Sequence, residues 1–69
     1  MSERLCDRLL TLRKAHGLTQ EQVAKRAKMT ARSVINYEQG ERVPPLPVLQ
    51  RLAKVFGVDV GVLARLEVS

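Results

Sequence analysis

Two short helical segments follow one another between Leu18 and Gly40, and they constrain the fold more than any other feature of the chain. Threonine is a favoured N-cap residue, so we expect the first helix to begin after Thr19 and the second after Thr30. Glycine commonly follows a helix, so Gly40 should end the second. Helices this short are not stable alone. The pattern therefore predicts two helices, joined by a three-residue turn, that other helices of the same domain hold in place.

The apolar residues of these segments recur with the period of helices buried on one side. The first helix would bury Val23, Ala24 and Ala27, and the second would bury Val34 and Tyr37. Helices that cross closely need small side chains at the contact, and Ala24 holds that position. We expect Val34 to pack against it.

The turn between the two helices is expected to need a positive φ, and Lys28 occupies that place. Glycine is the low-strain residue there. A lysine in left-handed backbone costs about 1 kcal/mol. Thr19 and Gln22 also have the spacing of a capping box, which supports a helix start at this point.

The rest of the chain predicts three more helices. One covers about residues 3–15, with Ser2 as its N-cap and His16 and Gly17 at its end. Its apolar stripe is Leu5, Leu9 and Leu12. After an extended loop over residues 41–46, Pro47 stands in the first turn of the next helix, where proline is tolerated. The buried face of that helix would be Leu49, Leu52, Ala53 and Phe56. Asp59 would cap a last helix over about residues 59–66.

Composition narrows the possible functions. At 69 residues the chain is expected to form one domain over 1–69, near the lower limit for folding on a hydrophobic core alone. The net charge of +5 favours polyanionic partners. Cys6 is the only cysteine, which excludes an intrachain disulfide and a cysteine-based zinc site. No residue set for catalysis, metal binding or cofactor binding is recognised, so we expect no enzyme, no metal and no cofactor. No stretch is long enough to cross a membrane, and the first residues do not form a signal peptide, so we expect a cytoplasmic protein.

Residues in register with a known family extend over most of the chain. They are Leu9, Leu12, Arg13, Gly17, Leu18, Thr19, Gln20, Ala24, Val34, Glu38, Gly40, Pro44, Leu49, Leu52, Ala53, Phe56, Gly57, Val58 and Leu63. This pattern resembles the phage repressor/Cro type of helix-turn-helix, the XRE family. The resemblance implies an all-α, five-helix, lambda-repressor-like DNA-binding domain with its motif at about residues 19–40. It also implies a sequence-specific transcriptional regulator, most simply a repressor, that binds double-stranded DNA.

The second helix of the motif has a polar face suited to reading bases. On a helical wheel at 100° per residue, Arg32, Asn36 and Gln39 lie opposite Val34. Arginine can bond guanine O6 and N7, and amide side chains can pair with adenine. A polar face that only meets solvent would look the same. The predicted base-reading residues are Ala31, Arg32, Ser33, Asn36 and Gln39. Ile35, beside this face, could pack on the loop over 42–44 or rest against thymine methyl groups.

Phosphate contacts are expected around this face. The resemblance implies that Gln20 bonds a phosphate and braces the reading side chains, and a helix N-terminus favours an anion. The complete set of predicted phosphate contacts is Gln20, Lys25, Arg26, Lys28, Thr30 and Arg42. Each basic member could instead be a charge that only aids solubility. The resemblance further implies an ion pair between Arg13 and Glu38 that locks the reading helix against the first helix.

The C-terminal segment is more apolar than one face of a short helix requires. Val62 and Leu66 are four residues apart and share a helical face, so we expect them to form the interface of a homodimer on a pseudo-palindromic operator. One alternative stays open: the chain could be an antitoxin or a protein–protein adaptor. In that case the apolar segment docks on a protein partner, and DNA binding is secondary or autoregulatory.

Overall fold

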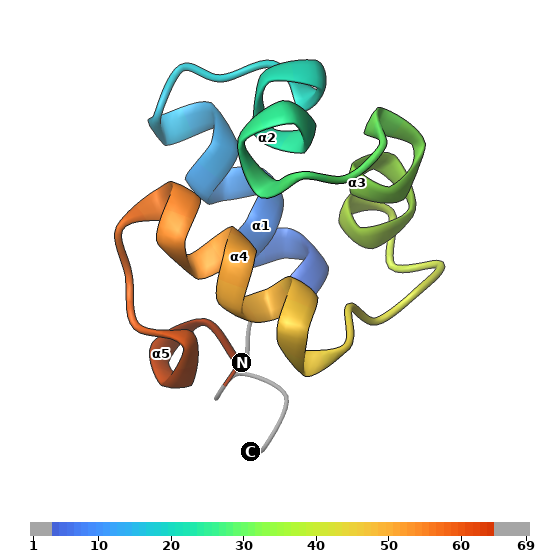
Figure 1. Ribbon diagram of the computed structural model, residues 1–69. Coiled ribbons are helices and arrows are strands. Elements are labelled where there is room, and N and C mark those ends of the chain that lie inside the picture. The colour runs from blue at the N-terminus through green and yellow to red at the C-terminus, as the bar shows by residue number, and fades with distance from the viewer. Residues whose placement is uncertain (1–3, 65–69) are drawn as a thin grey trace.

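The computed structural model describes residues 4–64, which form five α-helices and no strand. The helices are α1 (Leu5–Ala15), α2 (Gln20–Ala27), α3 (Ala31–Glu38), α4 (Leu46–Phe56) and α5 (Val60–Ala64). In Figure 1, α2 lies next to both α3 and α4, α1 contacts α3, and α5 lies next to α4 at the opposite end of the domain from α2. The predicted all-α, five-helix fold is confirmed.

Threonine caps begin both helices of the central pair. The Thr19 hydroxyl accepts a hydrogen bond from the backbone N–H of Gln22, at 3.1 Å, and the Gln22 side chain accepts one from the backbone N–H of Thr19, at 2.8 Å. Thr30 accepts a hydrogen bond from the N–H of Ser33 at 3.2 Å. Both predicted caps, and the capping box, are therefore confirmed.

The ends of the chain differ in part from the predicted helix bounds. The first helix begins at Leu5 rather than near residue 3, because Arg4 has extended backbone (φ −76°, ψ 155°) and is its N-cap. The predicted cap Ser2 lies outside the described residues, as do residues 65–69 beyond α5. In α4, Pro47 stands in the first turn of the helix, as predicted.

Left-handed backbone follows four of the helices. Gly17, Gly40 and Gly57 have φ of 66°, 77° and 67°, after α1, α3 and α4. After α2 the same conformation is taken by Lys28, with φ 58° and ψ 51°, and it is the only described residue other than glycine with a positive φ. This strained lysine permits the sharp turn from α2 to α3, as the sequence predicted.

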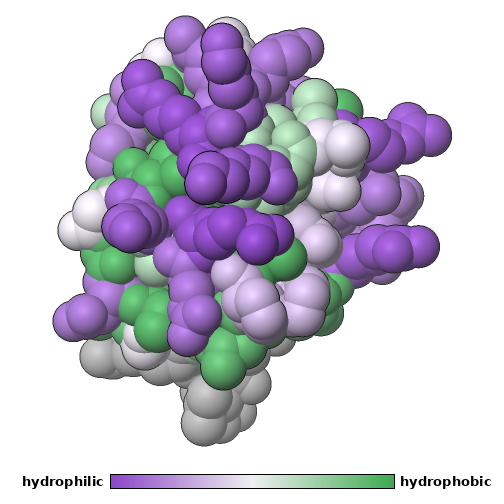
Figure 2. All heavy atoms as spheres, in the orientation of Figure 1, coloured by the Kyte–Doolittle hydropathy of each residue, from purple (hydrophilic) through white to green (hydrophobic). Residues whose placement is uncertain are grey.

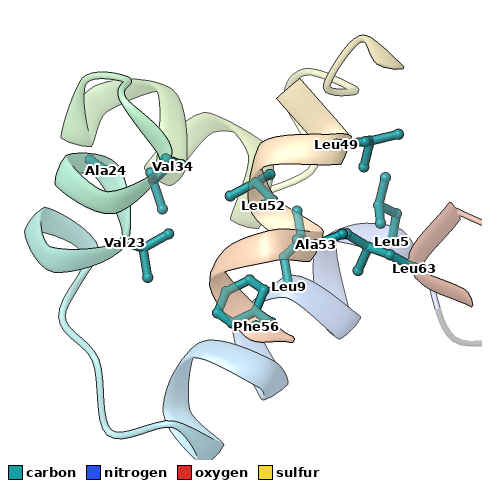
Figure 3. Packing of buried hydrophobic residues seen from close by; sticks show 11 residues of the cluster. Leu5, Leu9, Val23, Ala24, Val34, Leu49, Leu52, Ala53, Phe56 and Leu63 are labelled. Atoms are coloured by element: carbon teal, nitrogen blue, oxygen red, sulfur yellow. The ribbon is translucent and has the colours of Figure 1, made fainter. Parts of the chain in front are cut away.

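The core lies where the five helices meet. Its buried side chains are Leu5, Leu9, Val23, Ala24, Ala27, Val34, Leu49, Leu52, Ala53, Phe56 and Leu63. Figure 3 shows Ala24 and Val34 where α2 meets α3, with Leu52, Ala53 and Phe56 of α4 to their right in the view. Leu12, predicted in the core stripe of α1, is only half-buried. Because this core buries one side of α3, the opposite side faces outward in a fixed direction.

Candidate nucleic-acid interface

The outward side of α3 carries the predicted base-reading residues. At 100° per residue, Arg32, Asn36 and Gln39 lie within about 60° of one another and opposite the buried Val34. Arg32 and Gln39 are exposed, whereas Ala31, Ser33 and Asn36 are partly exposed. The Ser33 hydroxyl lies 3.0 Å from the Thr30 hydroxyl, so it is held at the start of the helix. Arg32, Asn36 and Gln39 thus form one polar strip, and Ser33 lies beside it at the start of the helix.

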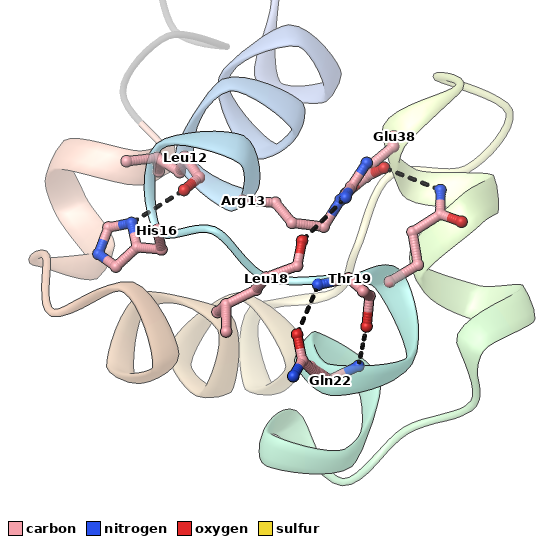
Figure 4. A network of polar contacts seen from close by, with 8 residues as sticks. Leu12, Arg13, His16, Leu18, Thr19, Gln22 and Glu38 are labelled. Atoms are coloured by element: carbon pink, nitrogen blue, oxygen red, sulfur yellow. Dashed lines mark hydrogen bonds and ion pairs between the residues drawn. The ribbon is translucent and has the colours of Figure 1, made fainter.

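A buried carboxylate holds α3 against the elements before it. Arg13 Nε donates to Glu38 Oε2 at 2.7 Å, and Gln20 Nε2 donates to Glu38 Oε1 at 3.1 Å. Arg13 Nη1 also donates to the carbonyl of Leu18 at 3.0 Å (Figure 4). The Arg13 and Glu38 side chains are only 14% and 6% exposed. The carboxylate at the end of α3 therefore joins α1, the loop before α2 and the first residue of α2.

The six predicted phosphate contacts are spread over α2, the turn after it, the start of α3 and the loop after α3. Gln20 and Thr30 lie at the starts of α2 and α3, and each already has a hydrogen-bonded partner within the domain. Arg42 is exposed in the loop after α3 and lines a small hollow of about 30 Å³ with Arg4 and Tyr37. Lys25 is exposed on α2. Thr30 and Arg42 thus flank the two ends of α3, and Gln20 and Lys25 lie on α2, which packs against α3.

Arg26 and Lys28 are placed differently. They line a groove between the end of α2 and the outer side of α4, together with Arg51 and Lys54. Two of the predicted phosphate residues therefore share a groove with side chains of α4. Sequence reasoning missed the basic pair on α4, because Arg51 and Lys54 belong to the solvent side of a helix outside the motif.

The candidate dimer residues are placed only in part. Val62 is 43% exposed on α5, whereas Leu66 lies outside the described residues. Two apolar side chains that the sequence reasoning did not select are more exposed: Val43 at 71% and Leu46 at 58%. Both flank the prolines of the loop between α3 and α4. Their exposure could have been inferred from the sequence, because neither residue belongs to the apolar stripe of any predicted helix.

Other kinds of site are absent from the described part of the chain. Residues 4–64 hold no group of three or more histidine, cysteine or acidic side chains that would bind a metal ion. Among the same residues, no helix is long and apolar enough to cross a membrane. Ile35 is half-buried beside the strip on α3.

Comparison with known proteins gives consistent similarities. A family model described as helix-turn-helix matches residues 9–63. An uncharacterised HTH-type transcriptional regulator of Bacillus subtilis, YobD, is 44% identical over 55 residues, which are 80% of this chain and 49% of that protein. The chain thus spans about half the length of this relative.

Solved structures are similar over almost the whole described chain. The restriction-modification controller protein C.AhdI from Aeromonas hydrophila has a TM-score of 0.82 at 30% identity, covering 86% of this chain and 89% of that one. The P22 c2 repressor protein, solved in complex with a synthetic operator, has a TM-score of 0.85 at 19% identity, with coverages of 90% and 94%. At that identity the second likeness concerns the fold alone.

Proposed function

Because this chain belongs to the helix-turn-helix family, in its XRE or Cro/C1 type, we propose that it is a transcriptional regulator that binds double-stranded DNA through α3. The observation that carries this proposal is the polar strip of Arg32, Asn36 and Gln39 on the side of α3 opposite its buried face. An α-helix fits the major groove, and each of these side chains has donors or acceptors that match base edges.

Direct base contacts need a helix with a fixed orientation. Glu38 supplies that constraint, because its two oxygens accept hydrogen bonds from Arg13 and Gln20 on other elements. We assign Arg13 and Glu38 a positioning role and no contact with DNA. Ala31, near the start of α3, offers its methyl group to a thymine methyl, and Ser33 offers its hydroxyl to either base type.

Phosphate contacts would surround the reading helix. Gln20 opens α2, and an N-terminus presents unpaired N–H groups and partial positive charge to an anion. One N–H of the Gln20 amide is used by Glu38, which leaves the second for a phosphate oxygen. Thr30, Lys25 and Arg42 complete the proposed backbone contacts. These contacts set register and affinity, whereas the strip on α3 sets specificity.

We further propose a repressor that acts as a homodimer on a pseudo-palindromic operator. A single small domain gains few contacts in one groove, and a second copy doubles them. The exposed apolar side chains Val43, Leu46 and Val62 provide surface for such a contact, with Leu66 as the candidate beyond the described residues. The P22 c2 repressor, whose fold is similar, is a repressor and was solved with operator DNA.

Selection from a random pool of DNA duplexes tests the proposal. We expect one enriched motif with two inverted half-sites, spaced about one helical turn apart. Binding to the enriched duplex should fall steeply with salt, because phosphate contacts release counterions. A pool that yields no enriched motif, together with binding that does not depend on salt, would refute DNA recognition. A single unrepeated half-site would refute only the dimer.

A further inference from the structure

A basic groove lies between the end of α2 and the outer side of α4. It has a volume of about 430 Å³ and is lined by Arg26, Lys28, Arg51, Lys54 and Val55. Figure 2, in the orientation of Figure 1, shows hydrophilic side chains over α2 and α4, and others that project at the right edge, where α3 lies. We use the name basic groove for these five residues.

The four cations of the basic groove have no anionic partner within residues 4–64. None of their side chains makes a hydrogen bond or an ion pair to another described residue, whereas the Arg13 side chain bonds Glu38 and the carbonyl of Leu18. No carboxylate lines the groove. Like charges held close together repel one another, so an anionic occupant would relieve repulsion and gain direct ion pairs.

The position of Arg26 on α2 turns the basic groove away from the strip on α3. At 100° per residue, Arg26 is about 60° from Val23 but about 120° from Gln20. It also lies six residues beyond Gln20, about 9 Å along the helix. Gln20 bonds to the end of α3, whereas Arg26 lines the same groove as Arg51 and Lys54 of α4. Arg26, Arg51 and Lys54 therefore belong to α2 and α4 and not to the reading helix α3.

The lining favours an acidic peptide over a nucleic-acid backbone. On α4, Arg51, Lys54 and Val55 are spaced i, i+3 and i+4, so they share one helical face. Val55 is half-buried and packs against the core, which gives the groove an aliphatic floor between its cations. Phosphates need only charge and hydrogen-bond donors, whereas a floor of this kind suits an apolar side chain. Clusters of arginine are also a recurring means of binding acidic motifs.

We propose that the basic groove binds an acidic segment of a partner protein, with carboxylates on the four cations and one aliphatic side chain on Val55. The partner would dock while α3 remains free for DNA. The proposal does not depend on DNA binding, since it rests on the groove alone.

A labelled peptide tests it. The probe is a fluorescein-labelled nonapeptide of seven glutamates and two leucines, and binding is followed by fluorescence anisotropy. The test variant is Lys54→Glu and the matched control is Lys14→Glu. Both lysines are exposed and stand in the last turn of an eleven-residue helix, so both changes alter net charge and the helix end equally. We expect Lys54→Glu to weaken binding roughly fivefold or more, and Lys14→Glu to weaken it less than about twofold.

Two further measurements, amide chemical shifts and duplex binding, decide between the possible outcomes. Addition of the peptide should change the NMR chemical shifts of backbone amides in α4 and at the end of α2. Shift changes confined to α3 would overturn the proposal. Equal losses in both variants would mean attraction by net charge only, and would overturn it too. The proposal is also overturned if the peptide does not bind and Lys54→Glu, but not Lys14→Glu, weakens binding to a mixed-sequence DNA duplex. The groove would then be a surface that binds DNA. Arg51→Glu is the second variant should Lys54→Glu fail to fold.

Discussion

Arg13 and Glu38 are 25 residues apart in sequence, yet the Arg13 Nε lies 2.7 Å from Glu38 Oε2. Both side chains are largely removed from solvent, so each carries a charge that the other must compensate. Because Glu38 also accepts a hydrogen bond from Gln20, one carboxylate sets the angle between α3 and two other elements. Any change in this pair should affect both the stability of the domain and the direction of the strip on α3.

Removal of Glu38 should therefore be costly. We expect Glu38→Ala to lower the free energy of unfolding by about 3–5 kcal/mol, because Arg13 would remain buried without its partner. The double variant Arg13→Met with Glu38→Ala should recover much of that loss. Urea unfolding followed by circular dichroism measures both. A single variant that unfolds at the same urea concentration as the unaltered protein would mean that the pair contributes nothing.

Arg32 is expected to read a base. Arg32→Ala should weaken operator binding by about 1–3 kcal/mol and relax the preference at one base-pair position. Titration against the selected operator and single-position variants of it measures both effects. An equal loss on every sequence would instead identify Arg32 as a phosphate contact.

Lys25 and Arg26 are adjacent, but the structure predicts different behaviour for them. Lys25→Ala should reduce the slope of log affinity against log salt by about one, as expected for one lost phosphate contact. Arg26→Ala should leave the slope unchanged, because Arg26 lines the basic groove. The measurement is operator binding at several salt concentrations. Equal slopes for the two variants would remove this distinction.

Lys28 carries backbone strain that a different residue would relieve. We expect Lys28→Gly to raise the free energy of unfolding by about 0.5–1 kcal/mol, because glycine adopts a φ of 58° at no steric cost but loses more entropy on folding. Lys28→Ala keeps the strained Cβ and is the matched control, with no gain expected. Thermal unfolding distinguishes them. A glycine variant no more stable than the alanine variant would contradict the strain.

Self-association should depend on exposed apolar side chains. Val62→Glu is expected to shift a dimer toward monomer at tens of micromolar in sedimentation, and to lower operator affinity sharply. Leu46→Glu and Val43→Glu test the other exposed site separately. If the unaltered protein is monomeric at that concentration, the proposed dimer is wrong. If only Leu46→Glu or Val43→Glu dissociates the dimer, the interface lies where the loop after α3 meets the start of α4.

The sequence by itself determined most of what is local. Thr19 and Thr30 cap their helices with groups only three residues away, and the left-handed turn at Lys28 follows from a helix that must end there. The residues that share the outward face of α3 also follow from the sequence alone, since a period of 3.6 residues places Arg32 opposite Val34 wherever the helix lies. The pairing of Arg13 with Glu38 came from the family resemblance rather than from the residues themselves.

Only the tertiary structure decided which distant side chains share a surface. The basic groove exists because α2 and α4 pack together, which places Arg26 and Arg51 along one groove although they are 25 residues apart in sequence. The same packing left Val43 exposed on the loop before α4 and Leu46 exposed at the first position of α4. Helix caps and apolar periods act over a few residues, whereas a groove depends on the angle and distance at which two helices cross, and these are set by the whole core.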